Sequence, residues 1–465
     1  MGHASRFLGS VAIAAVLSPA TGQAADEVAA LRAEVAALKA EYAERVTALE
    51  ARIDQLESTS PAAATVAAAE PPPAPPPSSS APARTSSAFN PAIAVILAGN
   101  YADLSRDPAD YHFAGFMPSG GEIGPGERSF NLGESEITMS ASVDPYFTAS
   151  LTAALSGDGE IGVEEAFFRT SSLPAGITVK GGRFFSGVGY VNELHAHAWD
   201  FVDQPLAYQA FFGGQYAQDG VQVKWLAPMD VFLELGAETG NGGGFPGTRL
   251  GRNGLNGTTL FAHAGGDLGD SIGWRAGVSW MDLDAEDRAY EDVDSLGRPV
   301  VNAFTGSSRT WIADATLKWT PTGDTRRREL KLQAEYLRRT EEGDLGFDID
   351  GADESAGYRS RQSGWYVQGT YRFMPRWRAG LRYDELDAGS TRIGLVRQGD
   401  LLAADFPLLL PGSPSRVTTM IDWSPSEFSR LRAQYAWDDA RDGETDRQML
   451  IQYIYAIGAH GAHKF

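Results

Sequence analysis

The chain has 465 residues, and 60 acidic against 39 basic side chains give it a formal net charge of −21. It contains no cysteine, which excludes a disulfide scaffold, a thiol enzyme and a thiolate metal site. The acidic balance argues against nucleic acid as a partner, because phosphate backbones require a basic face. After the signal-like start, no apolar stretch reaches the roughly 18 residues of a membrane-spanning helix. A transmembrane β-barrel remains compatible, because its alternating strands do not raise the mean hydropathy.

The first 24 residues have the features of a secretory signal peptide. Arg6 precedes an apolar run, Phe7–Leu17, and Gly22–Ala24 supplies the small residues of a cleavage site. We therefore predict a signal peptide over 1–24 and a mature chain in the cell envelope. A buried N-terminal helix is the alternative.

Two segments of contrasting composition follow, 25–58 and 59–89. In the first, apolar residues recur at spacings of three and four, as at Val28, Leu31 and Val35, with charged residues between them. This pattern predicts a periplasmic α-helical coiled coil, because a lone helix of this length is marginal in water. A single solvated helix is the alternative. The second segment is mostly Pro, Ala and Ser and predicts a semi-rigid linker.

The 376 residues from 90 to 465 repeat a period-2 alternation. A soluble β-sandwich shows the same alternation, but its connections follow no strict order of length. Here short turns alternate with longer connections, as a barrel inserted from one side of a membrane requires. We predict an all-β fold, a 16-stranded antiparallel transmembrane β-barrel in the outer membrane of a Gram-negative cell, preceded by the coiled coil and the Pro-rich linker. The expected longer connections are 102–127, 157–160, 187–215, 240–257, 284–307, 340–361, 387–414 and 439–445.

Tryptophan placement supports the barrel. Of the ten tryptophans, all but Trp199 fall near predicted strand ends, as in the two aromatic girdles of a membrane barrel. Trp311 and Trp319 lie on one predicted strand, and their separation spans roughly 20 Å of membrane at a tilt of about 40°. The last predicted strand ends at Phe465, which looks like the signal read by the outer-membrane barrel assembly machinery.

The strand face opposite the lipid carries charges of both signs. A charge facing lipid at mid-depth costs about 2–4 kcal/mol, so these side chains are assigned to the interior. There they would line an aqueous channel and set its ion preference. The alternative is that they pair with one another and brace the wall. The predicted pore-lining residues are Glu134, Glu136, Glu234, Asp314, Lys318, Arg372, Arg378, Arg382, Arg430 and Arg432.

The connection Gly187–Gln215 is richer in apolar and aromatic residues than the other connections, so we expect it to fold into the lumen as a constriction. Its imidazole and carboxylate groups suit Zn, Ni or Cu without cysteine. Structural histidines without a metal are the alternative. The predicted constriction residues are Glu193, His195, His197, Trp199, Asp200 and Asp203. The predicted metal ligands among them are Glu193, His195, His197 and Asp200.

Acidic residues crowd two other expected outer connections, at 282–294 and 341–354. A solvated face is the ordinary explanation. The functional alternative is capture of cations, or contact with lipopolysaccharide through bridging divalent ions. Outer-membrane lipid and lipopolysaccharide are the partners expected for the barrel as a whole.

Two neighbouring segments carry a resemblance to a known family. Glu164–Phe168 is an acidic-aromatic strand, and Ile177–Gly187 contains a Thr-Val-x-x-Gly-x-Phe sequence before the predicted constriction. In these features the chain resembles the phosphate-selective porin O/P group of outer-membrane channels. The resemblance implies a homotrimer that passes small solutes passively. It does not imply phosphate, because that group uses a basic constriction and this chain is acidic.

A second similarity concerns histidines. The ending His460–Phe465 and the His-Ala-His sequence at 195–197 are similar to outer-membrane proteins labelled zinc-regulated TonB-dependent receptors. Such receptors need about twenty-two strands and a plug domain. Only residues 25–89 lie between the predicted signal peptide and the barrel, so we do not expect TonB as a partner.

Together these features predict a porin-like channel for passive or weakly selective uptake of small solutes, including divalent metal ions or metal complexes. The alternative is a structural envelope tether, with the coiled coil as the attachment and the barrel as the anchor. We do not expect an enzyme, because the only close histidine pair lacks a partnering serine. No cofactor is expected beyond Zn or another divalent ion as bound or transported species.

Overall fold

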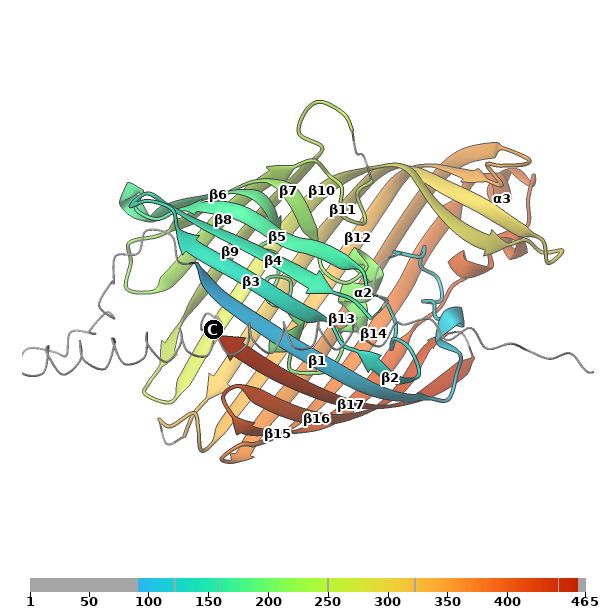
Figure 1. Cartoon of the computed structure of the whole chain (residues 1–465). Coiled ribbons are helices and arrows are strands. Elements are labelled where there is room, and N and C mark those ends of the chain that lie inside the picture. The colour runs from blue at the N-terminus through green and yellow to red at the C-terminus, as the bar shows by residue number, and fades with distance from the viewer. Residues whose placement is uncertain are drawn as a thin grey trace, which may run out of the picture. The chain divides into compact units, whose positions relative to one another are not determined.

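The computed structural model describes residues 91–458, apart from 121–122, 158, 249–250, 322 and 442. Over these residues the chain forms one antiparallel sheet that closes on itself as a barrel (Figure 1). The strand segments are β1 (Ala92–Leu104), β2 (Ser129–Leu132), β3 (Ser135–Ser142), β4 (Phe147–Leu155), β5 (Ile161–Thr170), β6 (Ile177–Phe185), β7 (Ala217–Leu226), β8 (Phe232–Gly240), β9 (Gly257–Leu268), β10 (Ile272–Val293), β11 (Pro299–Trp319), β12 (Glu329–Phe347), β13 (Glu354–Met374), β14 (Trp377–Ile393), β15 (Ser415–Ser426), β16 (Ser429–Arg441) and β17 (Glu444–Gly458).

The barrel closes between its first and last strands. β17 pairs with β1 along Ala94–Leu104. β2 and β3 follow each other along the other side of β1 and share one position, so the 17 described segments make a barrel of 16 strands. The predicted 16-stranded antiparallel barrel is therefore confirmed.

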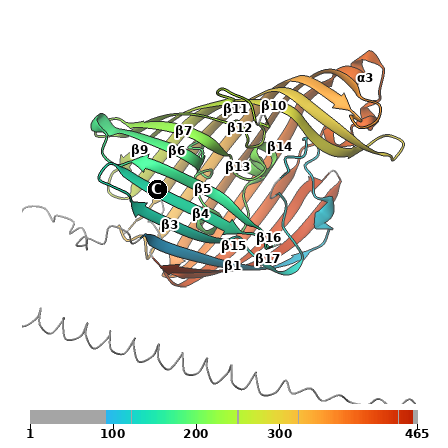
Figure 2. The same ribbon diagram turned by 45° about the horizontal axis from the view of Figure 1, so that its top comes forward.

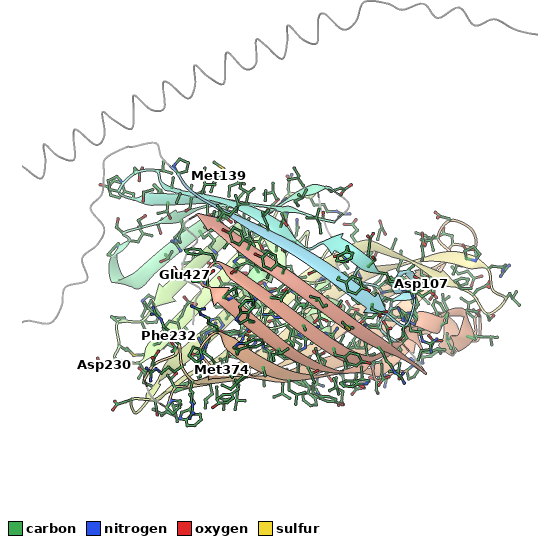
Figure 3. All side chains as sticks on the ribbon, turned by 60° about the horizontal axis from the view of Figure 1, so that its bottom comes forward. Asp107, Met139, Asp230, Phe232, Met374 and Glu427 are labelled. Carbon is green, nitrogen blue, oxygen red and sulfur yellow. The ribbon has the colours of Figure 1, made fainter. Side chains whose placement is uncertain are left out.

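The four longest connections, after β1, β6, β8 and β14, lie at one end of the barrel. Figure 3 shows Asp230, Met374 and Glu427, from three short turns, at one end and Asp107, from the connection after β1, at the other. The 3-10 helix η1 (Pro108–Asp110) lies in that long connection, and η2 (Pro174–Gly176) forms another short turn. The sequence predicts long connections at these four places, as 102–127, 187–215, 240–257 and 387–414.

The two faces of the strands differ as a membrane barrel requires. In β13, buried residues alternate with exposed or half-buried ones along most of the strand. Trp311 and Trp319 are 55% and 39% exposed on the outer face. Trp280 packs beside Trp311, with ring centroids 6.5 Å apart, and Trp377 stacks on Trp423 at 6.1 Å. These two pairs therefore lie at different levels of the outer surface, the second beside the short turn between β13 and β14.

Four strands are longer than the sequence suggested. The β10–β11 hairpin turns at 294–298 and the β12–β13 hairpin at 348–353, so the expected connections 284–307 and 340–361 are wrong. The reason is a second hydrophobic cluster near these hairpins, which gives the extended strands a face to bury. Its members include Tyr290, Phe304, Leu345, Phe347, Tyr358 and Phe406.

Short helices after β14 complete this second cluster. They are α3 (Gly394–Gln398), η4 (Ala403–Asp405) and η5 (Pro407–Leu409). Figure 2 shows α3 at the same end as the long hairpins. The cluster therefore lies at the long-connection end of the barrel.

The helix α2 (Leu206–Phe212) lies inside the barrel, where all of its residues are buried against β12, β13 and β14 (Figure 1). It ends at Gly213, whose φ of 66° gives the left-handed conformation that suits glycine. The main hydrophobic cluster joins Tyr208 and Phe211 of α2 to wall residues such as Leu337 and Tyr366. None of the described helices has the length and apolar character needed to cross a bilayer.

Several predictions fall outside the described residues. These are the signal peptide at 1–24, the coiled coil at 25–58, the linker at 59–89 and the terminal signal at Phe465. They stay predictions.

Candidate channel site

The segment Gly187–Gln215, called here the inserted loop, lies inside the barrel and contains α2 and the 3-10 helix η3 (Ala196–Ala198). Its base is tied by Asn192. The Asn192 amide donates to the carbonyls of Ser186 and Tyr216 at 2.8 and 2.9 Å, and the backbone N–H of Tyr216 donates to Asn192 Oδ1 at 2.8 Å. These bonds satisfy buried groups on both stems of the loop and hold the stems together.

Two aspartates of the inserted loop bind cations of the barrel wall. Asp200 forms ion pairs with Lys331, at 2.9 Å, and with Arg378. Burial would raise the pKa of Asp200, but Lys331 and Arg378 lower it far below its usual value.

Asp203 pairs with Arg382 at 2.9 Å and with Arg416 at 2.6 Å. Burial again opposes ionisation, yet the two guanidinium groups lower the pKa of Asp203 to about 2. Both aspartates are therefore ionised at neutral pH and fix the loop to the wall.

Arginines also bind the backbone of the loop. Arg430 donates to the carbonyl of His197 at 2.6 Å, and Arg432 donates to the carbonyl of Trp199 at 3.0 Å. We call the strands β12–β16 the anchoring wall, because they supply these arginines and the partners of the two aspartates. Of the predicted pore-lining residues, the loop covers Arg378, Arg382, Arg430 and Arg432.

The other predicted pore-lining residues lie around the rest of the inner wall. Glu234 lies 3.5 Å from Lys224 and 3.4 Å from His263. Asp314 is buried, 3.6 Å from Arg275. Lys318 and Arg372 share the inward face of their strands with buried neighbours. Glu134 lines the cavity described next, and Glu136 lies against the histidines of the loop.

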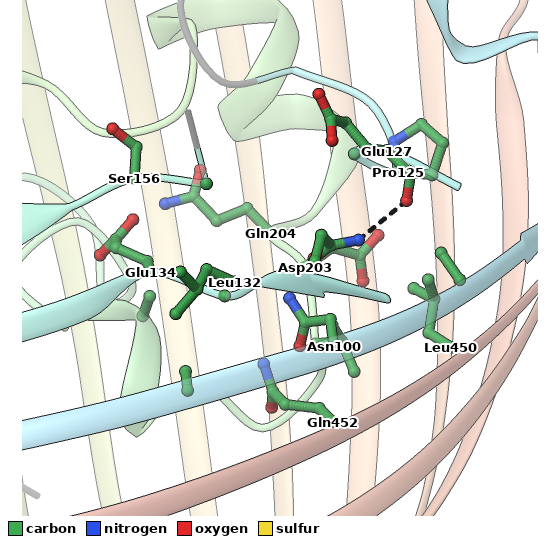
Figure 4. Close-up of a pocket in the computed structure, with 18 of the residues that line it drawn as sticks. Asn100, Pro125, Glu127, Leu132, Glu134, Ser156, Asp203, Gln204, Leu450 and Gln452 are labelled. Atoms are coloured by element: carbon green, nitrogen blue, oxygen red, sulfur yellow. Dashed lines mark hydrogen bonds between the residues drawn. The ribbon is translucent and has the colours of Figure 1, made fainter. Parts of the chain in front are cut away.

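A cavity of about 550 Å³ remains on the side away from the anchoring wall. Its wall side comes from β1, β17 and the β2–β3 edge, called here the open wall, and Figure 4 shows Asn100 and Gln452 there, opposite Asp203 and Gln204 of the loop. The ionisable residues lining it are Glu127, Glu134, Glu160, His197 and Asp203. Among the described residues, no lysine or arginine lines this cavity.

The two histidines of the loop meet a cluster of glutamates from β3 and β5. His195 Nδ1 lies 3.1 Å from Glu164 Oε2, and His195 Nε2 lies 3.1 Å from Glu165 Oε2. His197 Nδ1 lies 2.9 Å from Glu136 Oε1. Burial would lower the pKa of His195, but the hydrogen bonds to Glu164 and Glu165 and the charge of Glu136 raise it well above its usual value.

Two of the predicted metal ligands, Glu193 and Asp200, lie apart from the histidines in other ion pairs. Glu193 forms an ion pair with Lys224 at 3.1 Å, and Asp200 forms ion pairs with Lys331 and Arg378. Both carboxylates therefore bind cations of the barrel wall and do not contact the histidines. The carboxylates beside the histidines come from other strands, which spacing along the loop cannot reveal.

The bulge that turns both glutamates of β5 inward was also missed. β5 pairs with β4 as Thr152 with Glu165 and then Ala153 with Val163, which leaves Glu164 as an extra residue. Strict alternation would point Glu164 and Glu165 to opposite faces, whereas a bulge re-aims a side chain. Two adjacent acidic residues in a membrane strand were the available signal, since neither can face lipid without a cost.

No known family model matches the chain. An "Uncharacterized protein" of Aquifex aeolicus (strain VF5) is 30% identical over 408 residues, which cover 82% of this chain and 81% of the relative. Among solved structures, OmpT, an outer membrane protein of Vibrio cholerae, is 12% identical with a TM-score of 0.49, covering 81% of this chain and 100% of its own. An anion-selective porin from Comamonas acidovorans is 11% identical with a TM-score of 0.46, covering 79% and 99%. These structural likenesses are too distant to assign a function.

Proposed function

The chain belongs to the same family as the Aquifex aeolicus protein, and on the geometry of its barrel we propose that it is a passive, cation-preferring diffusion channel of an outer membrane. The observation that carries the proposal is the 550 Å³ cavity, which carboxylates line without a lysine or arginine among the described residues. Small solutes, including divalent metal ions, are the proposed cargo.

The position of the inserted loop explains the preference for cations. The arginines of the anchoring wall are bound to Asp200, Asp203 and loop carbonyls, so the loop screens them from the cavity. Solutes in the cavity face Glu127, Glu134 and Glu160 instead. Carboxylates at a narrow passage attract cations and repel anions, most strongly at low salt.

The outer surface supports placement in a membrane. Exposed large apolar side chains occur from β1 to β17, and the two tryptophan pairs lie at different levels of this surface. An apolar band between two aromatic girdles fits a bilayer. Contact with lipopolysaccharide, assembly as a homotrimer and insertion by the barrel assembly machinery belong to the same proposal.

Conductance in planar bilayers tests the proposal. With a KCl gradient across the membrane, we expect open channels whose reversal potential has the sign of a cation-selective pore. The double variant Glu127→Gln and Glu134→Gln should shift that potential toward zero, because it removes charge without changing side-chain volume. Glu354→Gln, at the exposed start of β13, is the matched control.

The outcomes separate two claims. A folded protein that inserts but does not conduct would contradict the channel itself. A conducting protein with an anion-selective reversal potential would contradict only the cation preference.

A further inference from the structure

We propose that Glu136, Glu164 and His195 form a binding site for a divalent transition-metal ion where the inserted loop meets β3 and β5. One ligand atom from each residue lies within 4.8 Å of those of the other two. The three residues come from β3, β5 and the inserted loop, so the site exists only when the loop is docked. This site does not depend on whether the barrel conducts.

The imidazole of His195 is oriented as a metal ligand would be. Its Nε2 lies 3.1 Å from Glu165 Oε2, which leaves Nδ1 facing Glu164 Oε2 at 3.1 Å and Glu136 Oε2 at 3.5 Å. Metal-binding histidines commonly donate their second ring N–H to a carboxylate, which fixes the tautomer and the ring plane. Glu165 is therefore the positioning residue for His195.

One carboxylate oxygen of the cluster lacks a hydrogen bond. Glu136 is 2% exposed, and its Oε1 lies 2.9 Å from Nδ1 of His197. Its other oxygen, Oε2, is buried without a hydrogen-bond partner and faces His195 Nδ1. A buried carboxylate oxygen is costly to leave unsatisfied, and a cation between Glu136, Glu164 and His195 would satisfy it.

The β-bulge supplies the second carboxylate. Because Glu164 is the extra residue in the pairing of β5 with β4, it reaches the same side of the strand as Glu165. Bulges often re-aim a side chain next to a functional site. Without the bulge only one of the two glutamates could meet the loop.

The surroundings leave the cluster rich in negative charge. Three glutamates face two histidines, and the backbone N–H of Phe185 donates to Glu165 Oε1 at 3.2 Å. Lys180 of β6 contributes one positive charge beside Glu165, and its ammonium also lies over the rings of Phe167 and Phe184 at 4.6 and 5.3 Å. The site therefore favours a bound cation.

The ligand types select the class of ion. One imidazole nitrogen with two carboxylate oxygens suits Zn²⁺ and its neighbours among the divalent transition metals, whereas Ca²⁺ and Mg²⁺ prefer oxygen ligands alone.

Titration calorimetry with Zn²⁺ on the full chain in detergent tests the site. Glu164→Gln keeps the size of the ligand but removes its charge, and we expect it to weaken Zn²⁺ binding at least about tenfold. His112→Ala and Glu354→Gln remove a histidine and a glutamate elsewhere, and both should bind Zn²⁺ as the parent does.

X-ray absorption of the zinc-loaded protein gives a readout that does not depend on folding of a variant. We expect one imidazole nitrogen and carboxylate oxygens at about 2.0–2.2 Å. A spectrum with two or more imidazoles, or Zn²⁺ binding that Glu164→Gln leaves unchanged, would overturn the site. Absence of Zn²⁺ binding would overturn it too and would identify the cluster as an ion-pair anchor of the loop.

Discussion

The anchoring wall and the open wall of the same barrel differ in the charges that they present to the lumen. The anchoring wall presents Lys331, Arg378, Arg382 and Arg416 to the aspartates of the inserted loop. The open wall presents small or uncharged side chains such as Ala98, Asn100 and Gln452 to the cavity, together with the carboxylate of Glu134. The loop lies on one side of the lumen because its aspartates pair with the cations of that wall and because the apolar face of α2 packs there. The passage is what remains on the other side.

The largest expected effect comes from breaking the contacts with the anchoring wall. In the double variant Asp200→Asn and Asp203→Asn, the buried Arg382 and Arg416 and the half-buried Lys331 and Arg378 each lose a carboxylate partner. Removing one partner of a buried ion pair costs about 3–5 kcal/mol, so the loop should detach locally. Single-channel conductance should then rise several-fold. Asp344→Asn, at an exposed position of β12, is the control. Unchanged conductance in the double variant would contradict the anchoring.

Acidification should release the same contacts without mutation. Because the folded pKa of Asp203 is depressed to about 2, its contribution is present above the unfolded pKa and is lost as the pH falls through the folded one. A shift of this size is worth roughly 2.5 kcal/mol. The guanidinium groups of Arg382 and Arg416 face Asp203, at 2.9 and 2.6 Å.

Conductance measured against pH should therefore be steady from neutral pH to about pH 4 and should rise as the pH falls toward about 2. An opening transition centred near pH 6 would assign the response to other groups.

A smaller effect is expected from the hydrogen bond that holds α2. Tyr208 donates to Glu335 at 2.8 Å, and Tyr366 also donates to this buried carboxylate. Tyr208→Phe removes one donor and leaves the other, so the protein should lose about 1 kcal/mol of stability against denaturant. Tyr371→Phe, on the outer face of β13, is the control. Equal losses in both variants would argue against a specific bond to Glu335.

The smallest expected effect comes from adding a positive charge to the open wall. Gln452→Lys places a cation on the open wall, where the cavity has none among its described lining residues. The preference for cations over anions should fall by about two- to fivefold, read from the reversal potential, because a single charge at a pore wall shifts its field modestly. An unchanged potential would mean that ions do not pass along this wall.

Much of this fold can be predicted from the sequence, because a barrel repeats one local rule. Alternation places Arg378 and Arg382 on the inner face and Trp311 and Trp319 on the outer face, as the structure has them. Alternation could not show that β10 and β11 continue into 284–307, where the sequence predicts a connection. These strands continue because residues from 394–414, distant in the chain, give them a face to bury.

The candidate site was predictable only in part. The apolar character of 187–215 indicates a loop inside the lumen, and its aspartates and histidines are predicted as constriction residues. Their partners were not, because pairing of Asp200 with Lys331, or of His195 with Glu164, depends on which strand lies opposite. The bulge at Glu164 also escapes a period-2 pattern, since it is defined by the neighbouring strand β4.

The seam between β1 and β17 has a consequence for how the molecule is made. Its partners, such as Ser105 and Asp446, joined at 2.9 Å, lie 341 positions apart in the chain. Contacts of such separation form late, because bringing distant segments together costs more chain entropy than forming a local hairpin. Until β17 is added, β1 and β16 each present an unpaired edge. A nascent sheet with two open edges is prone to aggregation. A chaperone that covers those edges until the barrel closes would therefore protect this protein more than faster folding of any hairpin.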